Sequence, residues 1–187
     1  MKLTKTDYLI YKDCAKNAWL KVHKPDIYYL KPLSAFDEGI IETGNEVDIL
    51  ARDLFPGGVI LESRDDKENT MELLNSETPV IYQPVFETDK YKIICDILVW
   101  NPLSKVYDLY EVKASNSGEN KNAKDKLYTD DIAFQYLVLR DLDIPIGRLN
   151  LVRFNSEYVR GGDLDIKQLF SIEDFTDRVV SLSLIHI

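Results

Sequence analysis

Three consecutive segments rich in β-branched and aromatic residues most constrain how this chain can fold. They begin at Val80, Tyr91 and Val106 and have the sequences VIYQPVF, YKIICDILVW and VYDLYEVK. The joins between them, ETDK and NPLS, are short and consist of residues typical of turns. Because short turns bring successive strands side by side, the sequence predicts a three-stranded meander.

Helical patterns lie on both sides of this meander. Before it, apolar residues recur at helical spacing, Thr6 or Asp7 is the expected first N-cap, and Pro25 and FPGG are the expected helix ends. After it, a charged loop leads into a further helix and a final strand. The predicted helices span 8–23, 36–54, 69–74 and 130–142, and the last strand spans 148–155. The main order, α-α-β-β-β-α-β, predicts an α/β (α+β) fold with helices flanking a central mixed sheet.

The length of 187 residues suits one domain. We expect it to span 1–181, with N-terminal helices at 6–54 and a core at 78–155. The last six residues, LSLIHI, look like the translated end of a transposase adapter used in sequencing libraries, so His186 is given no weight. The natural chain is then expected to continue into a C-terminal domain; an ordinary apolar tail is the alternative.

Composition excludes several classes of protein. Two cysteines and two histidines are too few for a disulfide framework and make a zinc site unexpected. The sequence has neither a signal peptide nor a long apolar run, which indicates a cytoplasmic protein without a membrane segment. The net charge of −9 argues against a nucleic-acid partner, unless carboxylates that hold divalent cations account for it.

Two carboxylates lie inside the predicted strands. Asp96 is flanked by apolar residues in IICDILVW, and Glu111 lies within DLYEVK. If these strands form a hairpin about residues 101–105, Asp96 lies opposite Glu111, where like charges repel. A hard cation bound to both, Mg²⁺ or Mn²⁺, would turn this repulsion into a site.

Lys113 follows Glu111 by two residues, so strand alternation places both side chains on one face. Two carboxylates, a lysine and a cation can together hydrolyse a phosphodiester. The alternative is an Asp96–Lys113 ion pair with Glu111 at the surface. Gln135 lies in the apolar stripe of the later helix, where its amide either reaches this site or caps a backbone group.

The combination of Asp96, EVK at 111–113 and AFQ at 133–135 resembles the motifs of the RecB-like branch of the PD-(D/E)XK nucleases. Their restriction-endonuclease-like core has the order α-β-β-β-α-β, which the predicted elements match apart from an additional N-terminal helix. More closely, the chain is similar to an uncharacterised bacterial family in which such a domain precedes a ribonuclease-H-like exonuclease domain. The similar segments are TKTDYLIYKDCAKNAWLK, GNEVDILARDLFPGG, ICDIL, YEVKAS, DDIAFQYLVL, and EYVRGGDLDIKQLF with the following EDFT.

This resemblance implies a role for each matching residue. Asp96, Glu111 and the carbonyl of Val112 would bind the metal ion. Lys113 would be the catalytic lysine, and Gln135 would be the glutamine of the helix motif.

Outside these motifs the match is looser. The family often adds an acidic ligand after a glycine of the preceding helix; after Gly44 we choose Glu46 over Asp48. Relatives often carry a tyrosine where this chain has Leu139. Some hold an iron–sulfur cluster, but Cys14 has no later trio of cysteines to join it, so no cluster is expected.

The leading hypothesis is therefore a metal-dependent nuclease that hydrolyses phosphodiester bonds of DNA, in repair or defence. Lys121, Lys124 and Arg160 are candidate substrate contacts, although a solvated loop and a simple turn explain them as well. The competing hypothesis is a catalytically inactive nucleic-acid-binding or docking domain of a larger nuclease protein. A structural protein–protein domain is a third.

Overall fold

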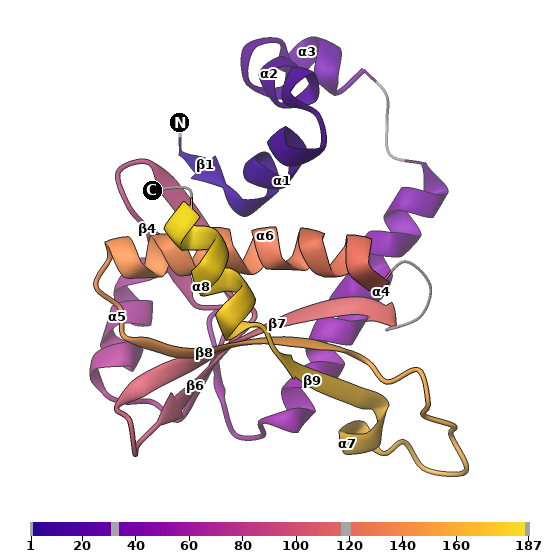
Figure 1. Ribbon diagram of the computed structural model, residues 1–187, viewed down its shortest axis with the longest axis vertical. Coiled ribbons are helices and arrows are strands. Elements are labelled where there is room, and N and C mark those ends of the chain that lie inside the picture. Colours follow the sequence, from indigo (N-terminus) through magenta and orange to yellow (C-terminus); the bar gives the residue numbers. More distant parts are fainter. Residues whose placement is uncertain (1, 31–33, 117–120, 186–187) are drawn as a thin grey trace.

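The computed structural model describes residues 2–30, 34–116 and 121–185, and a mixed six-stranded sheet forms its centre (Figure 1). The sheet has the order β2-β3-β6-β7-β8-β9; β7 and β8 run parallel, whereas β3, β6 and β7 are successively antiparallel. The strands are β1 (Leu3–Thr4), β2 (Val59–Ile60), β3 (Val80–Tyr82), β4 (Val85–Glu87), β5 (Tyr91–Ile94), β6 (Ile97–Asn101), β7 (Val106–Asn116), β8 (Ile146–Phe154) and β9 (Phe170–Asp174). The helices are α1 (Lys5–Asp13), α2 (Ala15–His23), α3 (Pro25–Tyr28), α4 (Ala35–Ala51), the 3-10 helix η1 (Arg52–Leu54), α5 (Lys67–Asn75), α6 (Lys121–Asp141), α7 (Ile166–Leu169) and α8 (Thr176–Ile185).

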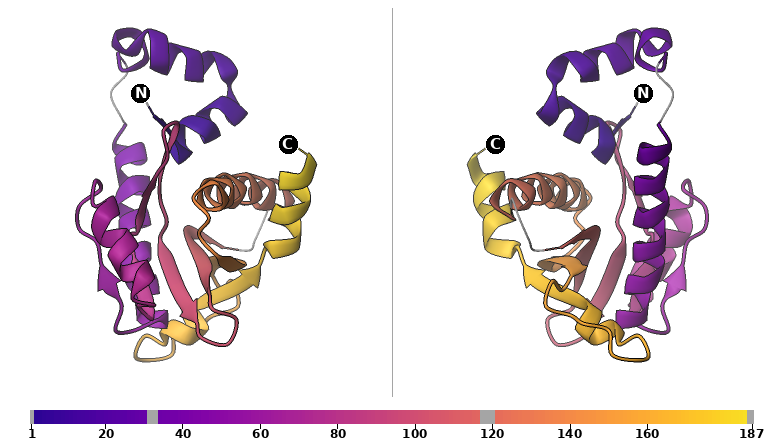
Figure 2. Two further views of the ribbon diagram at one scale, coloured as in Figure 1. Left: turned by 90° about the vertical axis from the view of Figure 1, so that its left-hand side faces the viewer. Right: turned by 90° about the vertical axis from the view of Figure 1, so that its right-hand side faces the viewer.

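Helices cover both faces of the central sheet, with α6 and α8 on one face and α4 on the other (Figure 2). Each face has its own apolar core because successive residues of a strand point in opposite directions. In β6, Leu98 belongs to the core that contains Ile132 of α6, whereas Ile97 belongs to the core that contains Val47 and Ala51 of α4. The predicted mixed sheet flanked by helices is therefore confirmed.

The predicted meander is confirmed as β3-β6-β7, with the register expected from a turn at 101–105. Its first two segments are nevertheless not single strands. Each bends in the middle, and the outer halves, β4 and β5, form a separate three-stranded sheet with β1. The bend lies at Gln83, which has a positive φ of 56°, and at Pro84, which has no N–H to donate to a neighbour. Hydrogen bonds from Gln83 N–H to the Asp96 carbonyl (2.9 Å) and from Cys95 N–H to the Pro84 carbonyl (3.1 Å) keep the two segments paired there.

The expected first helix is in fact two helices, α1 and α2. Cys14 between them has an extended backbone (φ −153°, ψ 106°), and Lys21 of α2 forms an ion pair of 2.7 Å with Asp7 of α1. This pair holds α2 back against α1, and helical periodicity gives no information on such a tertiary contact. Helix α1 also begins earlier than expected, because Thr4, rather than Thr6 or Asp7, is its N-cap and forms a capping box with Asp7.

The helices predicted before FPGG and within the polar segment that follows are confirmed as α4 with η1 and as α5. Helix α6 is longer than predicted and begins at Lys121 rather than near Asp130. The charges that suggested a loop here are partly buried: Asp125 forms an ion pair of 2.9 Å with Arg153 of β8. Residues 117–120 of the predicted loop lie outside the described residues.

The chain continues beyond β8, where the sequence predicted no further element. Strand β9 pairs antiparallel with β8, so the strand predicted at 148–155 is not the last and the sheet extends past the predicted core. Buried and exposed residues alternate only weakly along the sequence of β9, FSIED, as is common in a short edge strand. Helix α8 extends to Ile185, and Leu182 packs partly buried against the core; His186 lies outside the described residues. Among the described helices, none is both long and apolar enough to cross a membrane.

Candidate active site

Asp96 and Glu111 lie beside each other at the bend of the meander. The last paired residues of β6 and β7 at this end are Ile97 and Tyr110, so Asp96 directly precedes β6 opposite Glu111. Asp96 therefore lies in the bend itself, not within a strand that is covered on both faces. One oxygen of its carboxylate accepts a hydrogen bond of 2.8 Å from the N–H of Val112, which fixes the side chain against β7.

Glu111 is at the centre of a buried cluster, and only 1% of its side chain is exposed. Its Oε1 accepts hydrogen bonds from Nζ of Lys113 (2.6 Å) and from Nζ of Lys5 (2.8 Å). Its Oε2 accepts a hydrogen bond of 2.7 Å from Nε2 of Gln135. The alternative with Glu111 at the surface is therefore wrong. Lys113 shares its face as predicted, and Gln135 reaches the cluster rather than capping the backbone.

Asp131 of α6 is a member of the cluster that the sequence analysis missed. Its side chain is 1% exposed, and its Oδ2 lies 2.6 Å from Nζ of Lys113. Its Oδ1 accepts a hydrogen bond of 3.1 Å from Nε2 of Gln135, four residues later on the same helix face. That spacing is the signal that could have revealed Asp131, because residues four apart are neighbours on a helix.

Lys5 of α1 was also missed, although it contacts the same two carboxylates as Lys113. Besides its contact with Glu111, its Nζ lies 3.4 Å from Oδ1 of Asp131. Lys5 is the first residue of α1, where the helix dipole disfavours a cation. The buried carboxylates compensate for this position. No local sequence pattern could have revealed the contact, because Lys5 and Glu111 are 106 residues apart.

Burial and neighbouring charges shift the pKa values of the cluster residues in different directions. Burial would raise the pKa of Glu111, but the charges of Lys113 and Lys5 outweigh it and lower this pKa. Burial raises the pKa of Asp96 to about 8, assisted by the charge of Glu111, and the same two causes raise the pKa of Asp131. Although burial opposes it, the nearby carboxylates raise the pKa of both lysines. Of these three carboxyl groups, Glu111 is the one whose pKa is lowered, because it lies between the two ammonium groups.

The donor set suits a hard divalent cation. Asp96 and Glu111 supply carboxylate oxygens, which Mg²⁺ and Mn²⁺ prefer. Oε1 of Gln135 and Oδ1 of Asp48 are buried oxygens without a hydrogen-bond partner among the described residues. No three His, Cys, Asp or Glu side chains within the described ranges already form a group that could hold a metal ion. Because two ammonium groups contact Glu111, a cation would have to displace one of them or approach from Asp96.

The structure does not bring the other predicted site residues to this cluster. Glu46 of α4 is exposed, whereas Asp48 faces inward, accepts a hydrogen bond of 3.1 Å from Gln83 and adds its charge to the field at Asp96. Lys121 pairs with a glutamate of β9 at 3.5 Å. Lys124 on α6 is partly buried, and no described ion pair joins it to the cluster.

Arg160 is likewise outside the cluster. It lies in the loop between β8 and α7, and its Nε donates a hydrogen bond of 2.9 Å to the carbonyl of Gly162. Figure 1 shows this loop at the end of the molecule opposite α2 and α3. The Arg160 side chain is thus bonded within its own loop.

A cleft of about 420 Å³ opens beside Asp96. Three cations line it, namely Lys5, Lys92 of β5 and Arg64 from the segment between β2 and α5. It adjoins a second hollow of about 340 Å³ next to α4, with which it shares Arg64 and Gln83. The cleft therefore reaches the cluster at Asp96 and Lys5 and carries three basic side chains, in a chain with an overall charge of −9.

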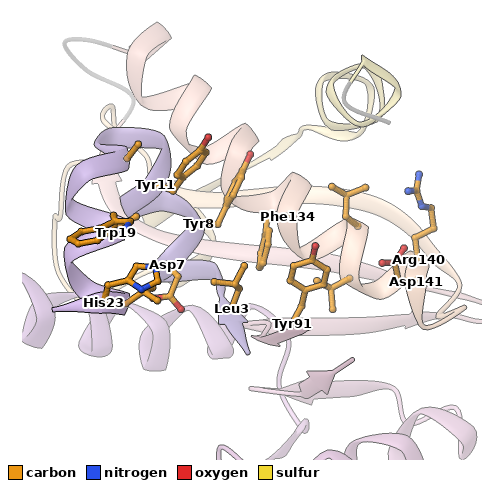
Figure 3. A pocket seen from close by; sticks show the side chains of 15 residues that line it. Leu3, Asp7, Tyr8, Tyr11, Trp19, His23, Tyr91, Phe134, Arg140 and Asp141 are labelled. Carbon is orange, nitrogen blue, oxygen red and sulfur yellow. The ribbon is translucent and has the colours of Figure 1, made fainter. Parts of the chain in front are cut away.

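A larger pocket of about 600 Å³ lies behind this cleft, between α1, α2 and α6 (Figure 3). The parallel pair of β1 and β5 separates the two: Leu3 and Tyr91 point into the larger pocket, whereas their neighbours Thr4 and Lys92 line the cleft. Aliphatic and aromatic side chains make up most of its lining, and the rings of Tyr8 and Phe134 stack with centroids 5.0 Å apart. Since it contains none of the cluster residues, the smaller cleft is the better candidate for chemistry.

Comparison with solved structures finds distant similarity. No family model and no curated protein sequence matches the chain. The structure is similar to an alkaline exonuclease from Laribacter hongkongensis, with 12% sequence identity and a TM-score of 0.47 over 99% of this chain and 87% of that one. It is also similar to the protein SSO0001, with 10% identity and a TM-score of 0.36 over 98% and 75% of the two chains. Both TM-scores are low, and neither protein bears on what this chain does.

Proposed function

We propose that this chain is a metal-dependent nuclease that hydrolyses phosphodiester bonds of DNA. The observation that carries the proposal is that residues chosen from one sequence motif meet in one place. Glu111 directly contacts Lys113 and Gln135, and Asp96 is held beside them by the N–H of Val112. Several buried charged side chains that gather beside a cleft are unusual in a core that has only a structural role.

The chain's own residues have distinct roles in this proposal. Nζ of Lys113 would stabilise the negative charge that develops on the phosphoryl oxygens and would orient the attacking water. Gln135 would position Glu111, since its amide donates to the carboxylate oxygen that the lysines leave open. A bound Mg²⁺ or Mn²⁺, held by Asp96, Glu111 and the carbonyl of Val112, would supply Lewis-acid stabilisation of the same charge.

The likeness to the RecB-like branch of the PD-(D/E)XK nucleases is part of this proposal. The order α4-β3-β6-β7-α6-β8 corresponds to the core arrangement of that superfamily, with β4 and β5 as an extension of the meander. DNA as substrate, action in repair or defence, a cytoplasmic location and a further C-terminal domain are proposed on the same resemblance.

The test combines metal binding with cleavage. We expect Mn²⁺ to bind in a calorimetric titration, and single- or double-stranded DNA to be cut in its presence but not in EDTA. Asp96→Ala and Lys113→Ala should abolish cleavage, whereas the matched variants Asp89→Ala and Lys90→Ala in the exposed turn before β5 should not. Circular dichroism would establish that all four variants fold. Cleavage that survives either of the first two changes would exclude this assignment of the active site.

One observation favours the competing function of an inactive nucleic-acid-binding or docking domain. Lys5 and Lys113 already neutralise Glu111 and Asp131 without any metal ion. A docking domain would need no metal ion to balance these carboxylates, and it would bind DNA without binding Mn²⁺. The calorimetric titration therefore separates the two functions before any cleavage assay is attempted.

A further inference from the structure

The cleft beside Asp96 contains cations that the cluster does not use. Lys5 is engaged with Glu111 and Asp131, but Arg64 and Lys92 contact neither of these carboxylates. Their positions follow from the fold. Pairing of β1 with β5 turns Lys92 into the cleft, and the segment after β2, whose Asp65 contacts Lys92, brings Arg64 to the same cleft. Two cations that the cluster does not use therefore line the cleft, where an anionic ligand could contact them.

Both cations are available to such a ligand. Arg64 is exposed, and its guanidinium makes no hydrogen bond or ion pair with any residue that the structure describes. Lys92 pairs with Asp65, whose side chain is 86% exposed. An ion pair with so exposed a partner contributes little to stability, so Asp65 can rotate into solvent when a stronger anion arrives. A guanidinium and an ammonium together are the groups that proteins use to hold phosphate.

We propose that Arg64 and Lys92 form a phosphate-binding subsite, which holds a second phosphate of the strand that is cleaved beside Asp96. This inference rests on the proposed nuclease function. The scissile phosphate must reach Asp96 and Lys113, so the phosphate held by Arg64 and Lys92 is a different one. The adjoining hollow beyond Gln83 continues the cleft towards α4, as a strand longer than one nucleotide requires.

The group that binds this subsite is a phosphate, which lies either within a DNA strand or at its end. We would measure the binding of a short fluorescent single-stranded DNA in EDTA by anisotropy, over a series of KCl concentrations. Arg64→Ala and Lys92→Ala should each weaken binding about tenfold and lower the slope of log affinity against log salt by about 0.7, the value for one phosphate contact on a single strand. Arg64→Lys keeps the charge, so it should preserve the slope while lowering the affinity.

Lys90→Ala is the matched control, since Lys90 is exposed in the neighbouring turn and does not line the cleft. Equal losses on circular and linear DNA would assign the subsite to an internal phosphate. A loss that occurs only with a 5′- or 3′-phosphorylated end would assign it to a terminal one. Both results support the subsite.

The two proposals fail in distinguishable ways. If the wild-type protein binds and cleaves DNA while Arg64→Ala and Lys92→Ala behave like Lys90→Ala, the subsite is wrong and the nuclease function stands. If the wild-type protein neither binds DNA in EDTA nor cleaves it in Mn²⁺, both are wrong. Thermal unfolding of each variant would show that the fold is intact, as expected for side chains at the cleft surface.

Discussion

Replacing Lys5 with methionine tests whether the buried cluster is built to receive a cation. The change removes the ammonium but keeps a side chain of similar length. Removing one partner of a buried ion pair typically costs about 3–5 kcal/mol. Here Lys113 still contacts both carboxylates and the Lys5 side chain is 22% exposed, so we expect a smaller loss, of about 2 kcal/mol. In a domain of this size that corresponds to a fall in melting temperature of roughly 6 °C.

A divalent cation should reverse this loss. If Asp96 and Glu111 bind Mn²⁺, the ion can replace the missing ammonium, and binding to the folded state alone adds about 2.7 kcal/mol at one hundred times the dissociation constant. Stabilisation by Mn²⁺ should also be larger in Lys5→Met than in the wild-type protein, in which the ion must compete with Lys5. Urea unfolding, followed by the fluorescence of Trp19 and Trp100, would measure both effects in EDTA and in Mn²⁺.

Lys16→Met is the control, because Lys16 is exposed on α2 and forms no described ion pair. If Lys5→Met in EDTA is as stable as Lys16→Met, the contacts of Lys5 with the carboxylates contribute nothing. If Mn²⁺ stabilises neither the wild-type protein nor Lys5→Met, the cluster is not a metal site, whatever the stability of the variants.

Three further predictions concern the surroundings of the cluster. Arg153 is fully buried between Asp125 and Glu173, so Arg153→Met should cost about 3–5 kcal/mol in urea unfolding; a loss below about 1 kcal/mol would contradict this. Burial would raise the pKa of Asp125, but hydrogen bonds from Arg178 and Arg153 outweigh it and lower this pKa. The stabilising effect of Asp125 is therefore present above about pH 4 and lost as the pH falls through the lowered pKa, so thermal unfolding of Asp125→Asn should approach that of the wild type only in acid. Gln135→Leu removes the amide donor to two buried carboxylates and should weaken Mn²⁺ binding at least about tenfold in calorimetry, whereas unchanged affinity would deny the positioning role.

The central part of the site could be predicted because it depends on local rules. Strand alternation and a short turn fix which residues of a hairpin face each other, so the register alone places Asp96 beside Glu111 and Lys113 on the same face. The bend at Gln83 and Pro84 could not be derived in this way. Proline in a β-rich segment signals an interruption, but which sheet the outer half joins depends on β1, far away in the sequence.

The site residues that were not predicted show two different limits of prediction from the sequence. Asp131 was within reach of helical periodicity, because it shares the face of Gln135. Lys5 was not, since its partner Glu111 is 106 residues away and no local pattern reports a contact over that separation. Glu46 was preferred to Asp48 for the same reason: only the packing of α4 on the sheet decides which acid points inward.

The overall charge of −9 is a poor guide to partners because tertiary structure redistributes it. Lys121 and Lys124, the lysines predicted to contact substrate, lie close together in the sequence, and Lys121 already pairs with a carboxylate of β9. The cations of the cleft come instead from three separate segments and form no run in the sequence. Local field, not net charge, steers a phosphate to a surface, and its effect falls off within about 10 Å at moderate salt. A cleft with Lys5, Arg64 and Lys92 can therefore attract a nucleic-acid strand to a protein that is acidic as a whole.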